Sequence, residues 1–294
     1  MRKIKKYLAM ACVSVMGLAA LTGCGSTGND LSEVKEDKAE AGSDVITFGT
    51  NAEFPPFEFV SSSGVIDNFD GIDMKIAKQI GDENNMTAKI ENMEFDSLLI
   101  ALENGQVDAV IAGMSITDER KEAVDFSTPY YSATQVMIVK EDSDIAKASD
   151  MKDKKIAVIQ GYTGEECVKE LGFEYEAFKK GTETILELIN GKCDVVVIDS
   201  ATAQKYVNDN PGLKIVEDAS AFANEEYGIA VKKGNQELLD KINAAIGKML
   251  EDGSIATWAT EYSDTDSEES SEETEEASDD AGDTEAENPA AEEE

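Results

Sequence analysis

The stretch NGQVDAVI at residues 104–111 is echoed 86 residues later by NGKCDVVV at residues 190–197. In both copies an Asn-Gly pair, which commonly ends a helix, precedes an apolar run typical of a strand buried on both faces. The echo predicts two lobes of similar construction, and the alternative is a chance likeness between two ordinary strand-helix units. The same offset pairs Gly113 with Asp199, just beyond the carboxyl ends of the matching strands, where open α/β sheets bind ligands.

Around each copy, short β-rich runs alternate with amphipathic stretches, the pattern of an α/β sheet flanked by helices. The first series predicts strands over 45–49, 88–91 and 107–112 and helices over 72–80 and 98–102. The second series predicts strands over 155–159, 173–178 and 195–198 and helices over 164–171 and 185–189. We therefore expect an α/β protein of two lobes, with a ligand cleft between them.

The composition limits the classes of function. The 294-residue chain has 26 basic and 62 acidic residues, a formal net charge of minus 36, and no histidine. So acidic a chain would repel a nucleic-acid backbone, and we expect no nucleic-acid partner. Without histidine the chain lacks the commonest general base and the commonest zinc ligand, so we expect no metal, no cofactor and no enzyme activity.

The first 23 residues have the features of a secretory signal. A basic start precedes an apolar run over 7–21, which is short for a membrane span of ~20 residues. The run ends in LTGC at residues 21–24, which resembles a bacterial lipobox and implies that Cys24 is acylated, with palmitate as one acyl group. The alternative is an uncleaved anchor helix. We expect a flexible tether over 24–43 and an extracytoplasmic body that is lipid-anchored to the cell membrane.

Residues 263–294 at the other end have 16 acidic side chains, no basic one and no large apolar one. This composition cannot form a core, so we expect a disordered acidic tail. A calcium-binding or spacing role is the alternative, although no stretch has the spacing of a calcium-binding hand. In the body, Cys167 and Cys193 could form a disulfide or remain thiols, and the sequence does not decide between them.

The segment that follows the first copy of the echo carries a cation in an unusual place. Thr117 suits a helix N-cap, which puts Arg120 in the first turn, where the helix dipole disfavours a positive charge. A guanidinium there suits an external carboxylate, and Ser115 could add a hydroxyl and an N–H group. The alternative is a surface ion pair between Arg120 and an acid of its own helix.

Other residues could complete a site around this cation. Thr163 follows a strand-to-helix turn that presents N–H groups to an anion. Asp199 ends an apolar strand and could bind an ammonium group or simply cap the next helix. Phe54 and Phe95 could flank a ligand or only pack in the core. Together these residues predict a zwitterion site, with the carboxylate on Arg120, the ammonium on Asp199 and the side chain between the rings.

Four segments resemble a known family. They are TNAEFPPFEF at 50–59, AVIAGMSITDER at 109–120, VDFSTPYY at 124–131 and the run over 181–199. They are similar to the polar amino-acid family of extracytoplasmic solute-binding proteins of ABC importers, and the likeness extends over about 44–262. The resemblance implies a periplasmic-binding-protein-like type II fold that closes on a free L-amino acid and offers it to a membrane permease.

The resemblance also implies roles for single residues. Residues that would hold the α-carboxylate are Arg120, Ser115 and Thr163; those that would hold the α-ammonium are the Gly113 carbonyl and Asp199; Phe54 and Phe95 would flank the ligand. It further implies a monomer whose lobe 1 comprises residues 44–130 and 227–262, and whose lobe 2 comprises residues 131–226 with the hinge strands. Closure would be a hinge motion about two strands.

Departures from the family bear on the ligand. Asn51 stands where several relatives that take basic or glutamine ligands carry Asp. Ile159 and Ile198 stand where glutamine binders carry Lys and His, although Glu53 could restore an acid. We expect a polar ligand, uncharged or cationic, with Asn51 among its contacts. Two other functions stay open: an amino-acid sensor, and a dehydratase or lyase that uses Glu53 or Asp199 as a base.

Overall fold

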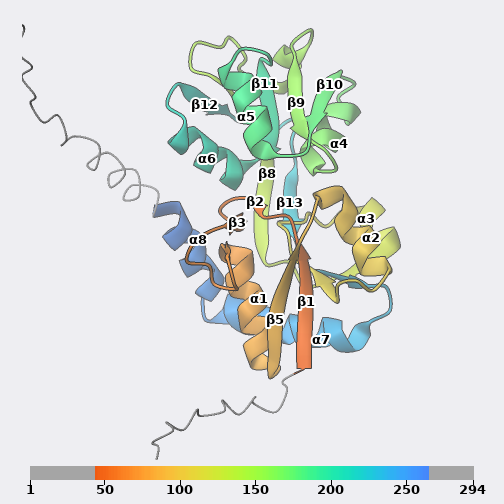
Figure 1. The fold of residues 1–294 in the computed structure, drawn as a ribbon. Coiled ribbons are helices and arrows are strands. Elements are labelled where there is room, and N and C mark those ends of the chain that lie inside the picture. Colours follow the sequence, from red (N-terminus) through yellow and green to blue (C-terminus); the bar gives the residue numbers. More distant parts are fainter. Residues whose placement is uncertain (1–43, 265–294) are drawn as a thin grey trace, which may run out of the picture. The chain divides into compact units, whose positions relative to one another are not determined.

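A computed structural model describes residues 44–264 as a mixed α/β protein with two main sheets, each flanked by helices (Figure 1). The predicted signal over 1–23, the acylated Cys24, the tether over 24–43 and the tail beyond 264 lie outside the described residues. The tail was predicted from 263, but the last helix continues through 264. No helix within the described range has both the length and the apolar composition needed to cross a bilayer.

The first sheet has the strand order β5-β1-β6-β14-β7. Its strands are β1 (Asp44–Thr50), β5 (Met86–Asn92), β6 (Ala109–Val110), β7 (Val124–Phe126) and β14 (Ala230–Lys232). Its helices are α1 (Ile72–Glu83), α2 (Leu98–Glu103), α3 (Asp118–Ala123), α7 (Gln236–Glu251) and α8 (Ser254–Asp264). β1 runs parallel to both β5 and β6, whereas β14 is antiparallel to its neighbours. The predicted strands at 45–49 and 88–91 and the predicted helices at 72–80 and 98–102 are confirmed.

The second sheet has the strand order β10-β9-β11-β8-β12. Its strands are β8 (Tyr131–Lys140), β9 (Ile156–Ile159), β10 (Tyr175–Phe178), β11 (Val195–Asp199) and β12 (Leu213–Val216). Its helices are α4 (Thr163–Glu170), α5 (Gly181–Ile189) and α6 (Ser200–Asp209). The neighbouring strands β10, β9 and β11 are parallel, as the alternation of strands and helices predicts.

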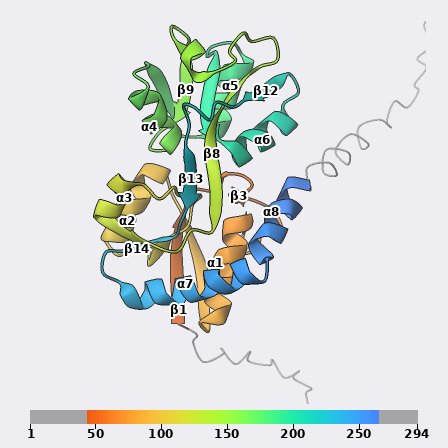
Figure 2. The same cartoon turned by 180° about the vertical axis from the view of Figure 1, so that it is seen from behind.

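Two antiparallel strands connect the sheets. Along β8 the chain passes from the first sheet to the second, and along β13 (Asn224–Tyr227) it passes back. The two strands are paired from Tyr131–Tyr227 to Thr134–Asn224. Figure 2 shows β8 and β13 side by side between the two groups of helices. The connection between the sheets, where the hinge is predicted, therefore consists of two strands that hydrogen-bond to each other.

The echo between the two lobes holds at the level of single hydrogen bonds. In the first copy, Asp108 accepts from Thr47 N at 2.8 Å through Oδ2, and Asp108 N donates to Thr47 O at 2.8 Å. In the second, Asp194 makes the same pair of bonds, both at 2.8 Å, with the backbone of Lys155. Both preceding helices end at the predicted asparagine, followed by a glycine of positive φ. The aspartate thus hydrogen-bonds to the backbone of the neighbouring strand at Thr47 in the first lobe, and to the residue just before it, Lys155, in the second.

Some elements differ from expectation. The strand predicted over 107–112 is only β6, because the chain pairs with β1 at two residues and then turns at Gly113. The strand predicted over 173–178 begins at 175, because Phe173 N still bonds to Val168 O at the end of α4. A small sheet of β2 (Glu53–Phe54), β3 (Glu58–Val60) and β4 (Phe69–Asp70) was not expected. Two 3₁₀ helices, Phe95–Ser97 and Ala148–Met151, complete the elements.

Candidate functional site

Arg120 lies at the start of α3, and the local sequence fixes it there. Thr117 caps the helix by accepting from Arg120 N at 3.2 Å, as its position predicts. The guanidinium is buried, with 8% of the residue exposed, and lies over the Phe95 ring at 5.4 Å. It donates through Nη1 to Ser115 O at 2.8 Å and through Nη2 to Gly161 O at 2.9 Å. Arg120 therefore contacts both lobes.

Arg120 has no carboxylate partner within the described residues. The alternative of a surface pair within its own helix is wrong, since Asp118 pairs instead with Lys121 at 3.2 Å. Only two of the five guanidinium N–H donors are used in 44–264, and the side chain faces a cavity of about 340 Å³ that Phe95, Gly161 and Glu166 also line. Burial lowers the pKa of this guanidinium, and the charges of Glu166 and Glu225 oppose that shift. A buried cation with free donors suits an anionic ligand.

Ser115 and Thr163 come from different lobes and meet at one point. Both are buried, and their hydroxyl oxygens are 3.5 Å apart. Each donates to the same oxygen, Oε2 of Glu225, at 2.5 Å from Ser115 and 2.7 Å from Thr163. Gln135 Nε2 donates to Thr163 Oγ1 at 3.0 Å and fixes its orientation. The two hydroxyls thus already bind a carboxylate, one that belongs to the chain.

Asp199 closes β11 on the other lobe and is 2% exposed. Asp199 occupies the N-cap position of α6, but its side chain makes no capping bond to that helix, so capping does not account for its carboxylate. Its Oδ1 accepts from Tyr227 Oη at 2.6 Å. Burial raises the pKa of Asp199 to about 7, with the charge of Glu225 as the next cause. An adjacent cation would restore the ionised form.

The two rings expected to flank a ligand are separated by a third ring. Tyr162 lies 5.4 Å from Phe54 and 4.4 Å from Phe95, measured between ring centroids. Its hydroxyl donates to Asn51 Oδ1 at 3.0 Å, while Asn51 Nδ2 donates to Met93 O at 2.9 Å. Phe54, Asn51 and Tyr162 are buried, and Phe95 is half-buried. The structure therefore brings the predicted residues together but places a residue of lobe 2 among them.

Gly113 turns the chain out of β6 with φ at +51°, a conformation that favours glycine. A Cβ there would lie 2.5 Å from the Phe54 ring, so no side chain fits. Gly113 N donates to Asp73 Oδ2 at 2.8 Å, and Tyr130 Oη donates to the same oxygen at 3.0 Å. Asp73 is fully buried beside Glu58. The Asp73 carboxylate thus fixes the position of the Gly113 backbone through this hydrogen bond.

Three residues that bear on ligand selectivity have other roles. Glu53 pairs with Lys180 across the cleft at 2.7 Å, so its carboxylate is engaged by lobe 2. Ile159 and Ile198 are buried in the main hydrophobic cluster.

Cys167 and Cys193 are free thiols. In the described part of the chain no cluster of three or more potential metal-ligating acids or cysteines is present.

Sequence reasoning missed Glu225, Tyr227 and the position of Tyr162. Successive residues of a strand face opposite sides, so once β13 is recognised as the returning strand, Glu225 and Tyr227 must share one face. The signal was present in the run NEEYGIA over 224–230, but its role as a strand depends on pairing with the distant β8. Tyr162 lies in the strand-to-helix turn before Thr163. The prediction for that turn rested on its backbone N–H groups and gave the ring no role.

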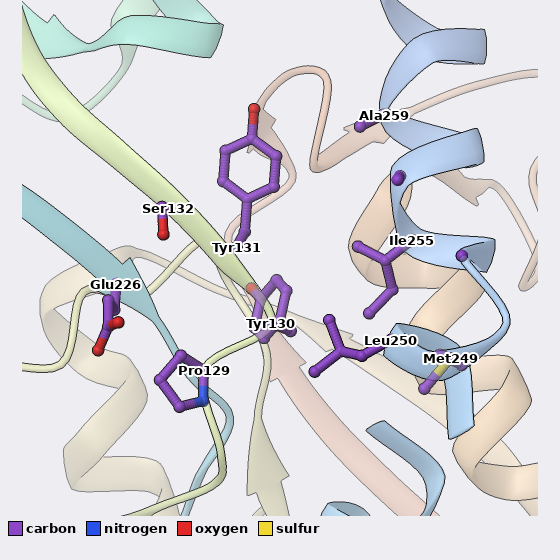
Figure 3. Close-up of a pocket in the computed structure, with 11 residues that line it drawn as sticks. Pro129, Tyr130, Tyr131, Ser132, Glu226, Met249, Leu250, Ile255 and Ala259 are labelled. Atoms are coloured by element: carbon purple, nitrogen blue, oxygen red, sulfur yellow. The ribbon is translucent and has the colours of Figure 1, made fainter. Parts of the chain in front are cut away.

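A larger pocket, of about 510 Å³, lies where β8 begins, beside α7 and α8. Figure 3 shows its lining, with Tyr130 and Tyr131 on one side and Leu250 and Ile255 on the other. None of the predicted site residues lines it. Despite its size we do not place the site there, because the buried polar groups converge in the cleft.

Comparison with known proteins identifies the family of the chain. Residues 46–265 match the model of the bacterial extracellular solute-binding proteins, family 3. The probable histidine-binding protein of Neisseria gonorrhoeae is 35% identical, covering 85% of this chain and 92% of that protein. The arginine-binding extracellular protein ArtP of Bacillus subtilis is 33% identical, covering 87% and 95%.

Solved structures show the same fold. The arginine-, lysine-, histidine-binding protein ArtJ of Geobacillus stearothermophilus has a TM-score of 0.70 at 34% identity, covering 74% of this chain and 95% of that one. An ancestral arginine-binding protein bound to glutamine has a TM-score of 0.69 at 42% identity, covering 74% and 97%. The matching proteins are two-lobed amino-acid-binding proteins, as the predicted fold class requires. The chain belongs to the bacterial extracellular solute-binding proteins, family 3.

Proposed function

We propose that this chain binds a free polar amino acid outside the cell and delivers it to the permease of an ABC importer. The observation that carries the proposal is the buried Arg120, which contacts both lobes and has no carboxylate partner within 44–264. A ligand carboxylate would supply that partner, and the ligand ammonium would meet Asp199 and the Gly113 carbonyl. Similarity to histidine-, arginine- and glutamine-binding proteins of ABC transporters supports a polar ligand.

The site residues carry distinct parts of the proposal. Arg120, Ser115 and Thr163 would bind the α-carboxylate, since a guanidinium and two hydroxyls converge from both lobes. Phe54, Phe95 and Asn51 would line the side-chain end of the cleft. Because binding would need contacts from both lobes, the ligand would favour the closed form. Lobe 1 would comprise 44–130 and 227–262, and lobe 2 would comprise 131–226.

The test is a calorimetric titration of the purified full chain with each of the common amino acids. Arg120→Ala is expected to abolish binding, because it leaves the ligand carboxylate buried without its cation, a loss of about 3–5 kcal/mol. Lys121→Ala is the matched control, since Lys121 neighbours it but is exposed and pairs with Asp118. Near-normal affinity in Arg120→Ala would contradict the site.

We further propose that the protein acts as a monomer, without enzyme activity, attached to the membrane through acylated Cys24. The family is one of solute-binding proteins, which supports a role in binding. The support for the anchor is the LTGC sequence alone. Metabolic labelling with radioactive palmitate should label the chain and spare Cys24→Ser, whereas equal labelling of both would contradict the anchor. Product formation from any bound amino acid would favour the lyase alternative.

A further inference from the structure

Glu225 stands where the ligand is proposed to place its own carboxylate. Its Oε2 accepts from Ser115 Oγ at 2.5 Å and from Thr163 Oγ1 at 2.7 Å, one hydroxyl from each lobe. Within the described chain Glu225 has no lysine or arginine at ion-pair distance, so these two hydroxyls are its polar anchors. The two hydrogen-bond donors are buried, since Ser115 is 3% exposed and Thr163 is 6% exposed.

The position of Glu225 follows from the hinge strand. β13 pairs with β8, and alternation along the strand turns Glu225 and Tyr227 toward the cleft and Glu226 away from it. Glu226 is exposed and lines the outer pocket beside Pro129 (Figure 3). Two neighbouring glutamates of one strand thus have opposite surroundings.

A hydroxyl has a single proton to donate. While Ser115 and Thr163 donate to Glu225, neither can donate to a second carboxylate. A ligand carboxylate at the same place would also be repelled by Glu225, since like charges at short range disfavour each other. Occupation of the two hydroxyls by Glu225 and by the ligand is therefore mutually exclusive.

Other groups of the cleft also contact the chain itself. Tyr162 fills the space between Phe54 and Phe95, and Tyr227 Oη donates to Asp199 at 2.6 Å. Glu225, joining Ser115 to Thr163, is the contact that mimics the charged end of an amino acid. Both hydroxyls thus donate to an acceptor that belongs to the chain.

We propose that Glu225 is an internal competitor for the α-carboxylate of the ligand, one that bridges the two lobes and must leave Ser115 and Thr163 when the amino acid binds. This inference rests on the proposed function. It makes Glu225 a determinant of affinity, because the ligand carboxylate must displace it from both hydroxyls.

Titration calorimetry of the full chain with L-arginine, L-histidine and L-glutamine tests the competition. Glu225→Gln removes the charge and keeps the shape, so the dissociation constant is expected to fall about tenfold, which corresponds to about 1.4 kcal/mol of lost repulsion. Glu226→Gln, the neighbour on the outer face, is expected to change it by less than about twofold. Unchanged binding in Glu225→Gln overturns the proposal, and so does weaker binding, which would instead assign Glu225 to the ligand ammonium.

A second measurement needs no ligand. Small-angle scattering of the ligand-free full chain should give a larger radius of gyration for Glu225→Ala than for the wild type and Glu226→Ala, because the bridge between the lobes is lost. The chain ends are the same in all three proteins, so a difference reports the lobes. Equal radii overturn the proposal. If the wild type binds no amino acid while the scattering difference appears, the proposed function fails and the bridge stands.

Discussion

At the scale of single residues, the glycine behind the cleft is the most constrained position. Gly113→Ala would combine left-handed backbone strain with a Cβ 2.5 Å from the Phe54 ring. We expect the free energy of unfolding to fall by about 2–4 kcal/mol, the sum of both effects. Urea unfolding of the full chain measures it.

Gly105 provides the control for this substitution. Its φ is +71°, but a Cβ there would meet nothing within 4 Å. Gly105→Ala should therefore cost only the backbone term, about 1 kcal/mol. Equal costs at the two glycines would mean that Phe54 moves freely aside, and the close packing described at the site would be wrong.

How far single residues could be predicted depends on what fixes them. Arg120, Ser115, Thr163 and Asp199 follow strands and turns visible in the local sequence, so their convergence could be expected. The role of Glu225 could not be predicted, because it arises from the pairing of β13 with β8, a strand about ninety positions earlier in the sequence. Tyr162 was in view, yet the space that its ring fills exists only once both lobes are in place.

At the scale of elements, α1 brings a buried acid against the backbone of β6. Burial raises the pKa of Asp73 to about 6 and that of Glu58 well above its usual value, with the neighbouring charge adding to the shift of Glu58. A folded-state pKa above the unfolded value of about 3.9 means that the folded state holds the proton more tightly. The stabilisation is complete below about pH 4 and is lost as pH rises through about 6.

We therefore expect the ligand-free chain to unfold at lower urea concentration at pH 8 than at pH 5. Asp73→Asn should flatten this dependence, because its Oδ1 can still accept from Gly113 N and Tyr130 Oη while the side chain cannot ionise. The remaining slope would come from Glu58 and Asp199: the pKa of Glu58 is raised well above its usual value, and that of Asp199 is raised to about 7. A steeper slope in Asp73→Asn than in the wild type would contradict the assignment.

Element bounds were predicted well wherever a helix or strand has its own periodicity or cap. α2 and α5 end at the expected asparagines because the glycine that follows takes up the left-handed conformation. The small sheet of β2, β3 and β4 was missed because its two- and three-residue strands are too short to show alternation. β6 is shorter than its apolar run because burial of 107–112 continues after strand pairing stops.

At the scale of the whole molecule, exposed polar contacts join the rims of the cleft. Asp96 of the first lobe accepts from Lys179 at 2.9 Å and from Gln160 at 3.0 Å, and Lys180 pairs with Glu53 at 2.7 Å. Exposed ion pairs contribute about 0.2–1 kcal/mol each and are screened by salt. These pairs should favour closure modestly, and only at low ionic strength.

The double substitution Lys179→Ala with Lys180→Ala is expected to weaken amino-acid binding by about two- to tenfold at low salt and by less than twofold in 1 M salt. Calorimetry at the two salt concentrations measures the difference. Lys154→Ala is the control, since its pair with Asp144 lies within the second lobe. An effect of equal size at both salt concentrations would mean that the lysines act by packing and not by charge.

The discontinuity of the first lobe has a consequence for synthesis on the ribosome. The five strands in the main order of the second sheet have been synthesised once Val216 is made, whereas the first sheet has a gap between β6 and β7 that only β14 fills. The first sheet therefore begins to be translated first but is completed last. Its strands β6 and β7 have unpaired edges until β14 has been synthesised. A chaperone that shields early β edges would serve this protein over the interval between residues 126 and 230.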